Sequence, residues 1–316
     1  MAVTLKDFIA SRMSLDVSLV GRLIDRLMNV EILVSKLDQE SAEIQDLQRQ
    51  WRSHDWVQAA DYHIVTLDYE FIDYSVDGPE VDYSRMKSYS QLESDINRGK
   101  SYATPARVPG RRPSKEAVDA PFNDAWNRTV RARSVTRQSL MDILSLVFGK
   151  TGEIRLHWAE KSPAMLKTSP SGGARHPTEA YVTILEVKGL ERGWYHFNPE
   201  TYELELLNPT VEQSELSTIF PGAYKRAPFN PVALVTLTCV FERNMYRYRE
   251  PRTFRSIHMD AGHLATSLEI ACAGRGLRTF THYGVKESHF EQILTLNFLE
   301  ESPMLAVAIG SSEGGL

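Results

Sequence analysis

The residues of this chain that can do chemistry are densest in the stretch SPSGGARHP, which begins at Ser169. Gly172 and Gly173 can adopt positive φ and carry no Cβ, so a flat ligand can approach the backbone there. Ser171 offers a hydroxyl, and Arg175 offers a planar fork of donors for an anion or a carbonyl edge. A tight surface turn with an incidental charge is the alternative. The composition favours a loop that accommodates a ligand close to its backbone.

A second cluster lies in the segment NRTVRARSVTRQS, just before a predicted short helix. It holds the arginines Arg128, Arg131, Arg133 and Arg137. Arginines and a serine such as Ser134 near a helix start suit a phosphate, through charge-assisted hydrogen bonds and the helix dipole. The alternative is a solvated basic face, which is the usual meaning of an isolated charge run.

A third segment, FERNMYRYREPRTFR, mixes cationic and aromatic side chains directly after a predicted buried strand. It holds five arginines together with Tyr246 and Tyr248. Such a segment can line a pocket for an anionic or peptide substrate. Otherwise it is a loop whose charge is neutralised by Glu242 and Glu250.

The segment SIHMDAGHLATSLEIACAGRG is the clearest predicted helix of the chain. His258 and His263 are five residues apart, about 140° around a helix, so they do not share one metal ion. We therefore expect no metal, and we expect Asp260 and His263 to form a structural pair. Gly262 inside the helical pattern predicts a close approach of another segment.

Length and composition bound the class of protein. The 316 residues suffice for two packed units, and 42% hydrophobic with 24% charged residues is ordinary for a globular protein. The net charge of -5 argues against a general nucleic-acid binder. We find neither a membrane-length apolar run nor a signal peptide, so we expect a cytoplasmic protein. Cys239 and Cys272 form no CxxC pair and are expected to be buried thiols.

The chain divides by composition into three parts. Residues 1–75 are rich in helix formers, and we expect a helical or winged-helix-like unit there; helices packed on the main domain are the alternative. Residues 76–120 are polar and broken by Gly and Pro, which is typical of a long connector, wrapped over a neighbouring surface. Residues 121–316 alternate between strand and helix patterns and form the main domain.

Within residues 121–316 the patterns predict an α+β fold. Two of the predicted helices have clear ends, at Gly149 and at Gly274 or Gly276. The predicted strands are AYVTILEV, GLERGWYHFN, TYELELL, PVALVTLTCVF, LRTFTHYG and MLAVAIG, with the second and third forming a two-stranded meander. We expect a central, mostly antiparallel sheet with helices packed against it.

Several segments together, across roughly residues 125–310, resemble the SagB/ThcOx-type dehydrogenases of the FMN-dependent nitroreductase superfamily. They are ARSVTR, SPSGGARHP, GWYHFNP, RYREPRTFRSIHMDAGHL and AGRGL. The pair SPSGGARHP and DAGH at this separation is the most specific of these signals. The resemblance implies a nitroreductase-like fold with an N-terminal extension.

The resemblance also implies an FMN site and a homodimer with FMN at the subunit interface, to which the helix around Gly262 would contribute. The loop residues implied to lie along the flavin ring and ribityl chain are Ser169, Pro170, Ser171, Gly172, Gly173 and Arg175. Those implied to lie at the phosphate are Arg131, Arg133, Ser134, Gly276 and Leu277.

Two departures from the family pattern bear on the chemistry. Ala132 and Thr136 stand where the phosphate segment usually has basic residues, so an arginine one step away would hold the phosphate. Azoline oxidases of the family carry Lys-Tyr where this chain has Arg247-Tyr248. An arginine does not act as a base, because it does not lose its proton, so Tyr248 is the candidate base.

We expect an FMN-dependent dehydrogenase that matures a ribosomal or nonribosomal peptide natural product, by azoline-to-azole or a related oxidation. The expected substrate is a peptide or a carrier-bound group, and a cyclodehydratase is a candidate partner. An NAD(P)H-fed nitro or quinone reductase is one alternative. A catalytically silent scaffold in a peptide-modifying complex is another.

Overall fold

The structure is a computed structural model that describes residues 17–29, 46, 48–67, 72, 75–92, 99–113, 134–155 and 163–311. The chain forms two units, Met1–Tyr69 and Glu70–Leu316. In the first unit the described helices are α2 (Val17–Asn29) and α4 (Val57–Val65). Helices were expected in this region, and the winged-helix-like arrangement stays a prediction.

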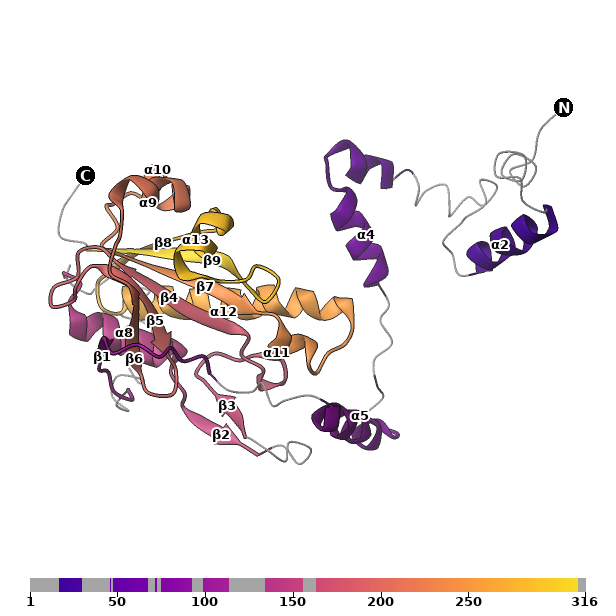
Figure 1. Cartoon of the computed structure of the whole chain (residues 1–316), viewed down its shortest axis with the longest axis horizontal. Helices are drawn as coiled ribbons and strands as arrows, with labels where there is room; N and C mark the ends of the chain where they lie inside the picture. Colours follow the sequence, from indigo (N-terminus) through magenta and orange to yellow (C-terminus); the bar gives the residue numbers. More distant parts are fainter. Residues whose placement is uncertain are drawn as a thin grey trace. The chain divides into compact units, whose positions relative to one another are not determined.

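The second unit is built on a seven-stranded sheet in which every pairing is antiparallel, with the order β1-β6-β5-β4-β7-β9-β8 (Figure 1). Its strands are β1 (Arg107–Val108), β4 (Thr178–Ile184), β5 (Gly193–Asn198), β6 (Glu203–Asn208), β7 (Ala233–Val240), β8 (Arg278–His282) and β9 (Glu301–Gly310). A separate hairpin pairs β2 (Gly152–Ile154) with β3 (Ala164–Leu166). The expected mostly antiparallel sheet is confirmed.

Helices cover both faces of the sheet, because its central strands are apolar on both sides. On one face lie α8 (Arg137–Phe148) and α12 (Phe254–Ala273), packed on side chains such as Val182 and Ile184 of β4. On the other lie α9 (Gln213–Ile219), α10 (Pro221–Lys225) and α13 (Glu287–Leu294), packed around Tyr181, Trp194 and Phe290. The remaining described elements are α5 (Gly78–Leu92), α11 (Glu242–Met245), η1 (Gly172–Ala174) and η2 (Pro251–Thr253).

The two helices that border the predicted site end at the glycines expected from the sequence, and α8 also has a capped start. Thr136 caps α8, since its Oγ1 accepts from the backbone N–H of Ser139 while Ser139 accepts from that of Thr136. Gly149 follows the last residue of α8. Gly274 caps α12, and Gly276 has φ +69°.

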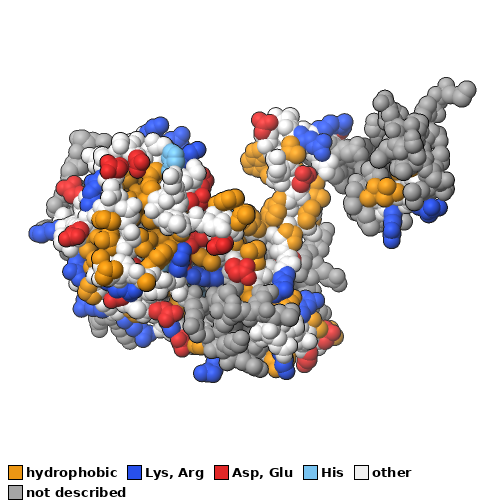
Figure 2. Space-filling view, viewed as in Figure 1, with side chains coloured by type: hydrophobic (Ala, Val, Ile, Leu, Met, Phe, Trp, Pro, Cys, Tyr) orange, Lys and Arg blue, Asp and Glu red, His pale blue; other side chains and the backbone are white. Residues whose placement is uncertain are grey.

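The surface charges and the cysteines agree with what the composition predicts for a globular protein. Acidic and basic side chains of the described residues are interspersed on the face shown in Figure 2. None of the helices in the described part of the chain combines the length and apolarity that crossing a bilayer requires. Cys239 and Cys272 are free and buried, as expected, and burial raises the pKa of both thiols.

The predicted connector is more ordered than its composition suggests. It contains the 15-residue helix α5, and it supplies the edge strand β1, in which Arg107 pairs with Glu205 of β6. We call residues 99–108, which run over the sheet to β1, the strap. Polar composition masked these elements because each buries only a narrow strip of side chains.

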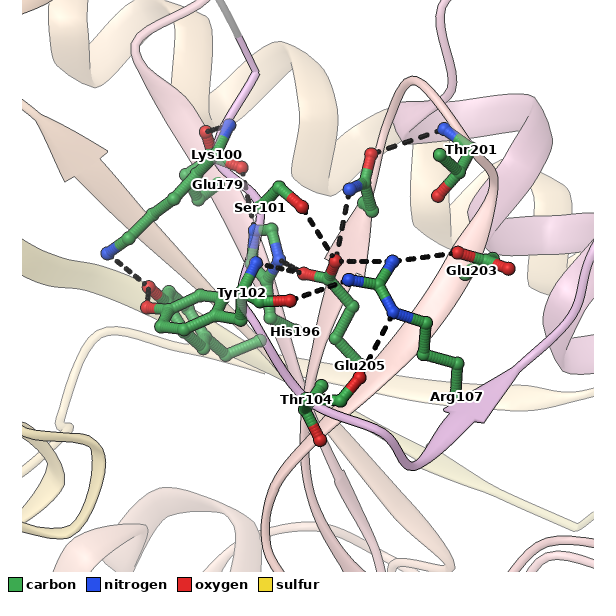
Figure 3. A network of polar contacts seen from close by, with 12 residues as sticks. Lys100, Ser101, Tyr102, Thr104, Arg107, Glu179, His196, Thr201, Glu203 and Glu205 are labelled. Atoms are coloured by element: carbon green, nitrogen blue, oxygen red, sulfur yellow. Dashed lines mark hydrogen bonds and ion pairs between the residues drawn. The ribbon is translucent and has the colours of Figure 1, made fainter.

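A buried network of charged side chains holds the strap to the sheet (Figure 3). The ring nitrogens of His196 on β5 lie 3.0 Å from Glu179 on β4 and 2.9 Å from Glu205 on β6. Glu205 accepts from the backbone N–H of Tyr102 at 3.0 Å and pairs with Arg107 at 3.0 Å. The network thus joins three strands to the strap.

Glu179 is the member of this network with partners on the most elements. It pairs with Arg243 on α11, bonds His196 on β5, and accepts from the backbone N–H of Lys100 in the strap at 3.3 Å. The Lys100 side chain pairs with Glu301 on β9. Charges balance across the whole set: Lys100, Arg107, His196 and Arg243 against Glu179, Glu203, Glu205 and Glu301.

The pKa values of the network follow from this arrangement. Burial alone would lower the pKa of His196, but the flanking carboxylates outweigh it and raise that pKa. Burial alone would raise the pKa of Glu179, but Arg243 and His196 hold it well below its usual range. Both ring nitrogens of His196 face carboxylates, so the arrangement favours its imidazolium form.

Replacing His196 by glutamine should leave the two buried carboxylates without their shared cation. We expect His196→Gln to lower the free energy of unfolding by about 3 kcal/mol or more. The stabilisation from His196 is fully present below the ordinary pKa of 6.5 and is lost as pH rises through the raised folded-state value. The deficit of the variant should therefore shrink from about pH 6 to about pH 9 in denaturant unfolding.

The matched control is His289→Gln, because His289 is exposed on α13. It should unfold like the wild type at both pH values. A deficit of His196→Gln that is absent, or that grows toward alkaline pH, contradicts the charged network.

Candidate functional site

The SPSGGARHP loop lies at the start of β4 and is tied to α12. Ser169 and Ser267 hydroxyls are 2.9 Å apart, and the Ser171 hydroxyl donates to Asp260 at 2.6 Å. Ser171 also accepts from the backbone N–H of His176 at 2.9 Å. Burial raises the pKa of Asp260, and the hydrogen bond from Ser171 acts against that shift. The loop is held as a fixed shape on the helix.

The two glycines of the loop face different surroundings. A Cβ on Gly172 would meet no described atom within 4 Å, so the backbone is open to a ligand there. Gly173 has φ +59°, and a Cβ on it would collide with the Tyr248 hydroxyl. The structure therefore brings the loop together with the predicted catalytic tyrosine.

Arg247, the other predicted catalytic residue, is largely buried beside Tyr248. Its Cζ lies 5.3 Å from the centroid of the Tyr248 ring, and its Nη2 donates to Asp82 of α5 at 2.8 Å. Burial alone would lower the pKa of Arg247, but Tyr248 and Asp82 favour the charged form and raise it. Arg247 acts here as a cation.

Arg175 was expected to offer its donors to a ligand, which stays a prediction, and its described contacts are with Arg243 and Tyr246. Its side chain is buried, Nε donates to the Arg243 carbonyl at 2.7 Å, and Cζ lies 5.2 Å from the Tyr246 ring centroid. Arg243 in turn donates to the His176 carbonyl at 2.9 Å. The two arginines brace the loop against the segment that carries Tyr248.

Sequence reasoning missed Lys167, which stands two residues before the loop. Burial lowers the pKa of this half-buried lysine to about 8, with Glu179 acting against the shift and Arg243 adding to it. Burial together with Lys167 and Arg243 lowers the pKa of His176 to about 3, so His176 is neutral. A lysine next to a glycine-rich loop was the signal available in the sequence.

The predicted phosphate residues lie at the other end of β4. Ser134 lines a cavity of about 660 Å³ with Lys188 and Phe229. Gly276 and Leu277 precede Arg278, whose Cζ is 5.1 Å from the Phe229 ring centroid, so they share this end of the sheet. Arg131 and Arg133 lie outside the described residues. The structure separates this group from the loop by the length of β4.

The adjacent glycines of the loop offer a matched pair of substitutions. Gly173→Ala forces a Cβ into the left-handed region and against Tyr248, so it should destabilise the protein by at least about 1–2 kcal/mol. Gly172→Ala meets open space and should cost about 1 kcal/mol or less. Thermal unfolding of the two variants checks this, and equal midpoints would contradict the placement of Tyr248 beside Gly173.

Comparisons with known proteins agree with the fold. The trifolitoxin-processing protein TfxB of Rhizobium leguminosarum bv. trifolii is 29% identical, over 81% of this chain and 71% of its own length. A structure assigned as a nitroreductase from Anabaena variabilis aligns with TM-score 0.52 and 20% identity, over 73% of this chain and 45% of that one. One from Ralstonia eutropha aligns with TM-score 0.51 and 17% identity, over 70% and 97%.

These two structures support the fold alone, and the chain spans less than half of the Anabaena protein. The model of the Nitroreductase family matches residues 127–311, which is more than half of this chain. That range contains the SPSGGARHP loop, Tyr248, α12 and all strands of the large sheet except β1. The expected resemblance is confirmed: the chain belongs to the nitroreductase family.

Proposed function

We propose that this chain is an FMN-dependent dehydrogenase of the SagB type that oxidises a peptide or a carrier-bound group. The observation that carries the proposal is the contact between Gly173 and Tyr248, beside the open backbone at Gly172. An open glycine backbone suits a flat ring, and a phenol at its edge suits proton transfer. The other features below support this assignment.

The residues present fit FMN if two copies of the chain share it. Helix α8 begins three residues after Ser134, and the carbonyl of Leu146 near its end accepts a hydrogen bond from Thr168, just before the loop. Its 12 residues measure about 18 Å, so Ser134 and the loop lie about that far apart. Packed side chains such as Leu140 and Ile143 fill the face between these ends. Ser134 at the phosphate and the loop at the ring therefore suit a flavin held between protomers of a homodimer.

The exposed side of α12 is suited to such an interface. Met259 and Ile270 are exposed there, and no described atom lies within 4 Å of a Cβ placed on Gly262. The close approach expected at Gly262 is thus not made within the described part of the chain. A second copy that packs on this strip would cover apolar surface and make that approach.

The chemistry requires a two-electron oxidation of the substrate. FMN supplies a hydride acceptor when bound. Tyr248, as its phenolate, would accept the proton that the substrate loses together with the hydride. Arg247 would remain a fixed positive charge beside the Tyr248 ring, since its pKa is raised. A base of this kind is worth about 10²–10⁴-fold in rate.

The peptide assignment draws on the relative TfxB, whose name gives it a role in processing trifolitoxin. By analogy, this chain would act on a peptide alongside other maturation enzymes, such as a cyclodehydratase. A reductase fed by NAD(P)H uses the same cofactor in the opposite direction, and a scaffold uses none. The FMN content of the protein distinguishes a dehydrogenase from a scaffold, and the reductant that reduces FMN distinguishes a dehydrogenase from a reductase.

The purified protein should be yellow and hold FMN, at about one per chain after incubation with the cofactor. Gly173→Val should lose it, because a branched side chain displaces Tyr248 and distorts the loop. Absorbance spectra and flavin release on denaturation measure the content. If the wild-type protein shows no flavin bands after incubation with FMN, it is not a flavin enzyme, and the scaffold alternative is the function that remains.

Tyr248→Phe removes the phenol proton and keeps the ring beside Gly173. Flavin content should survive, and the anaerobic reduction of FMN by a peptide substrate should slow by about 10²–10⁴-fold. Stopped-flow absorbance follows the reduction, with NADPH as the comparison reductant. Rapid reduction by NADPH and none by peptide makes the chain a reductase, and an unchanged rate in the variant removes Tyr248 from the mechanism.

A further inference from the structure

Helix α5 lies outside the range matched by the family model and presents one face to the rest of its unit. Val81, Asp82, Met86, Tyr89 and Ser90 are buried or half-buried, while the other residues from position 79 to 91 are exposed. These positions recur at helical spacing, which marks one packed face. The face meets the segment that carries the candidate base.

Two contacts join this face to both neighbours of Tyr248 in the chain. Asp82 Oδ2 lies 2.8 Å from Arg247 Nη2, and both side chains are largely buried. The guanidinium carbon of Arg249 lies 3.8 Å from the centroid of the Tyr89 ring. Stacking at that distance is a cation–π contact. Residues 247–249 are thus held to α5 on both sides of Tyr248.

We propose that Asp82 is a positioning residue, which holds the Arg247 guanidinium beside the Tyr248 ring and so fixes the phenol against Gly173. This rests on the proposed function, in which Tyr248 is the base. Asp82 itself touches no reacting atom in this account. Helix α5, from outside the matched family range, is then a working part of the site.

The physical reason is the long, rotatable side chain of Arg247. An arginine has about 2 kcal/mol of rotamer entropy, so a single orientation needs a partner that selects it. Asp82 supplies a carboxylate on a packed helix, which opposes the fixed positive charge of Arg247 in a partly buried setting. With Gly173 on one side and Arg247 on the other, the Tyr248 ring has little freedom.

The strap reinforces the same arrangement from farther along the chain. Lys100 donates its backbone N–H to Glu179, and Glu179 pairs with Arg243, four residues before Arg247. Helix α5 and the strap therefore hold residues 243–249 at three points. Asp82 and Tyr89 of α5 make direct contacts, and Lys100 of the strap acts through Glu179. Asp82 contacts the residue directly before the candidate base.

The test uses Asp82→Asn in the full chain, with Glu80→Gln as its matched control. Glu80 lies on the exposed side of the same helix, so the control removes the same charge without touching Arg247. Hydrogen exchange by NMR or mass spectrometry reads the Tyr248 amide, which bonds to the Asn244 carbonyl at 2.9 Å. We expect exchange there to be about tenfold faster in Asp82→Asn and unchanged in the control.

A double-mutant cycle with Arg247→Gln separates positioning from general loosening of α5. If Asp82 acts through Arg247, Asp82→Asn should add little in the Arg247→Gln background. Asp82→Glu, which keeps the carboxylate, should restore slow exchange. Equal exchange in Asp82→Asn and Glu80→Gln, or full additivity with Arg247→Gln, overturns the proposal.

A second readout uses FMN-loaded protein. A tyrosine near the ring quenches flavin emission, so Tyr248→Phe and Asp82→Asn should both brighten it, and the double variant should be no brighter than Tyr248→Phe. Emission in Asp82→Asn equal to that of the wild type overturns the positioning role. If the Tyr248 amide exchanges faster in Asp82→Asn but the protein takes up no FMN, the positioning role of Asp82 holds and the proposed function is wrong.

Discussion

The fold of the second unit depends on one buried carboxylate, that of Glu179. It follows the SPSGGARHP loop by only a few residues, and it bonds Arg243, His196 and the Lys100 backbone. Those partners belong to the segment of the candidate base, to the sheet and to the strap. Because buried charges are tolerated only in pairs, each of these segments has to be in place for the others to be stable.

This constraint explains how a loop of unusual backbone can serve a site. Gly173, Ala174 and His176 all have positive φ, which costs free energy for the two residues that are not glycine. The loop keeps that shape because Ser171 bonds Asp260 on α12 and Arg243 bonds the His176 carbonyl. The rigid surroundings leave Gly172 as the open part of the backbone.

Much of this arrangement was predictable from the sequence, and the failures share a cause. Alternating and helical patterns predicted the strands and the ends of α8 and α12, and the motifs predicted that Tyr248 belongs with the loop. Asp82 and Lys100 were missed because their partners lie 165 and 201 residues away, and such pairs leave no local pattern.

A crystal structure of the FMN-loaded protein tests the central claim most directly, that the loop and Tyr248 form one flavin site. The account predicts a dimer in which the flavin ring lies against Gly172 and Tyr248 of one protomer and the phosphate lies at Ser134 of its partner. A flavin bound away from the loop, or one whose ring and phosphate are both held by a single protomer, would contradict it.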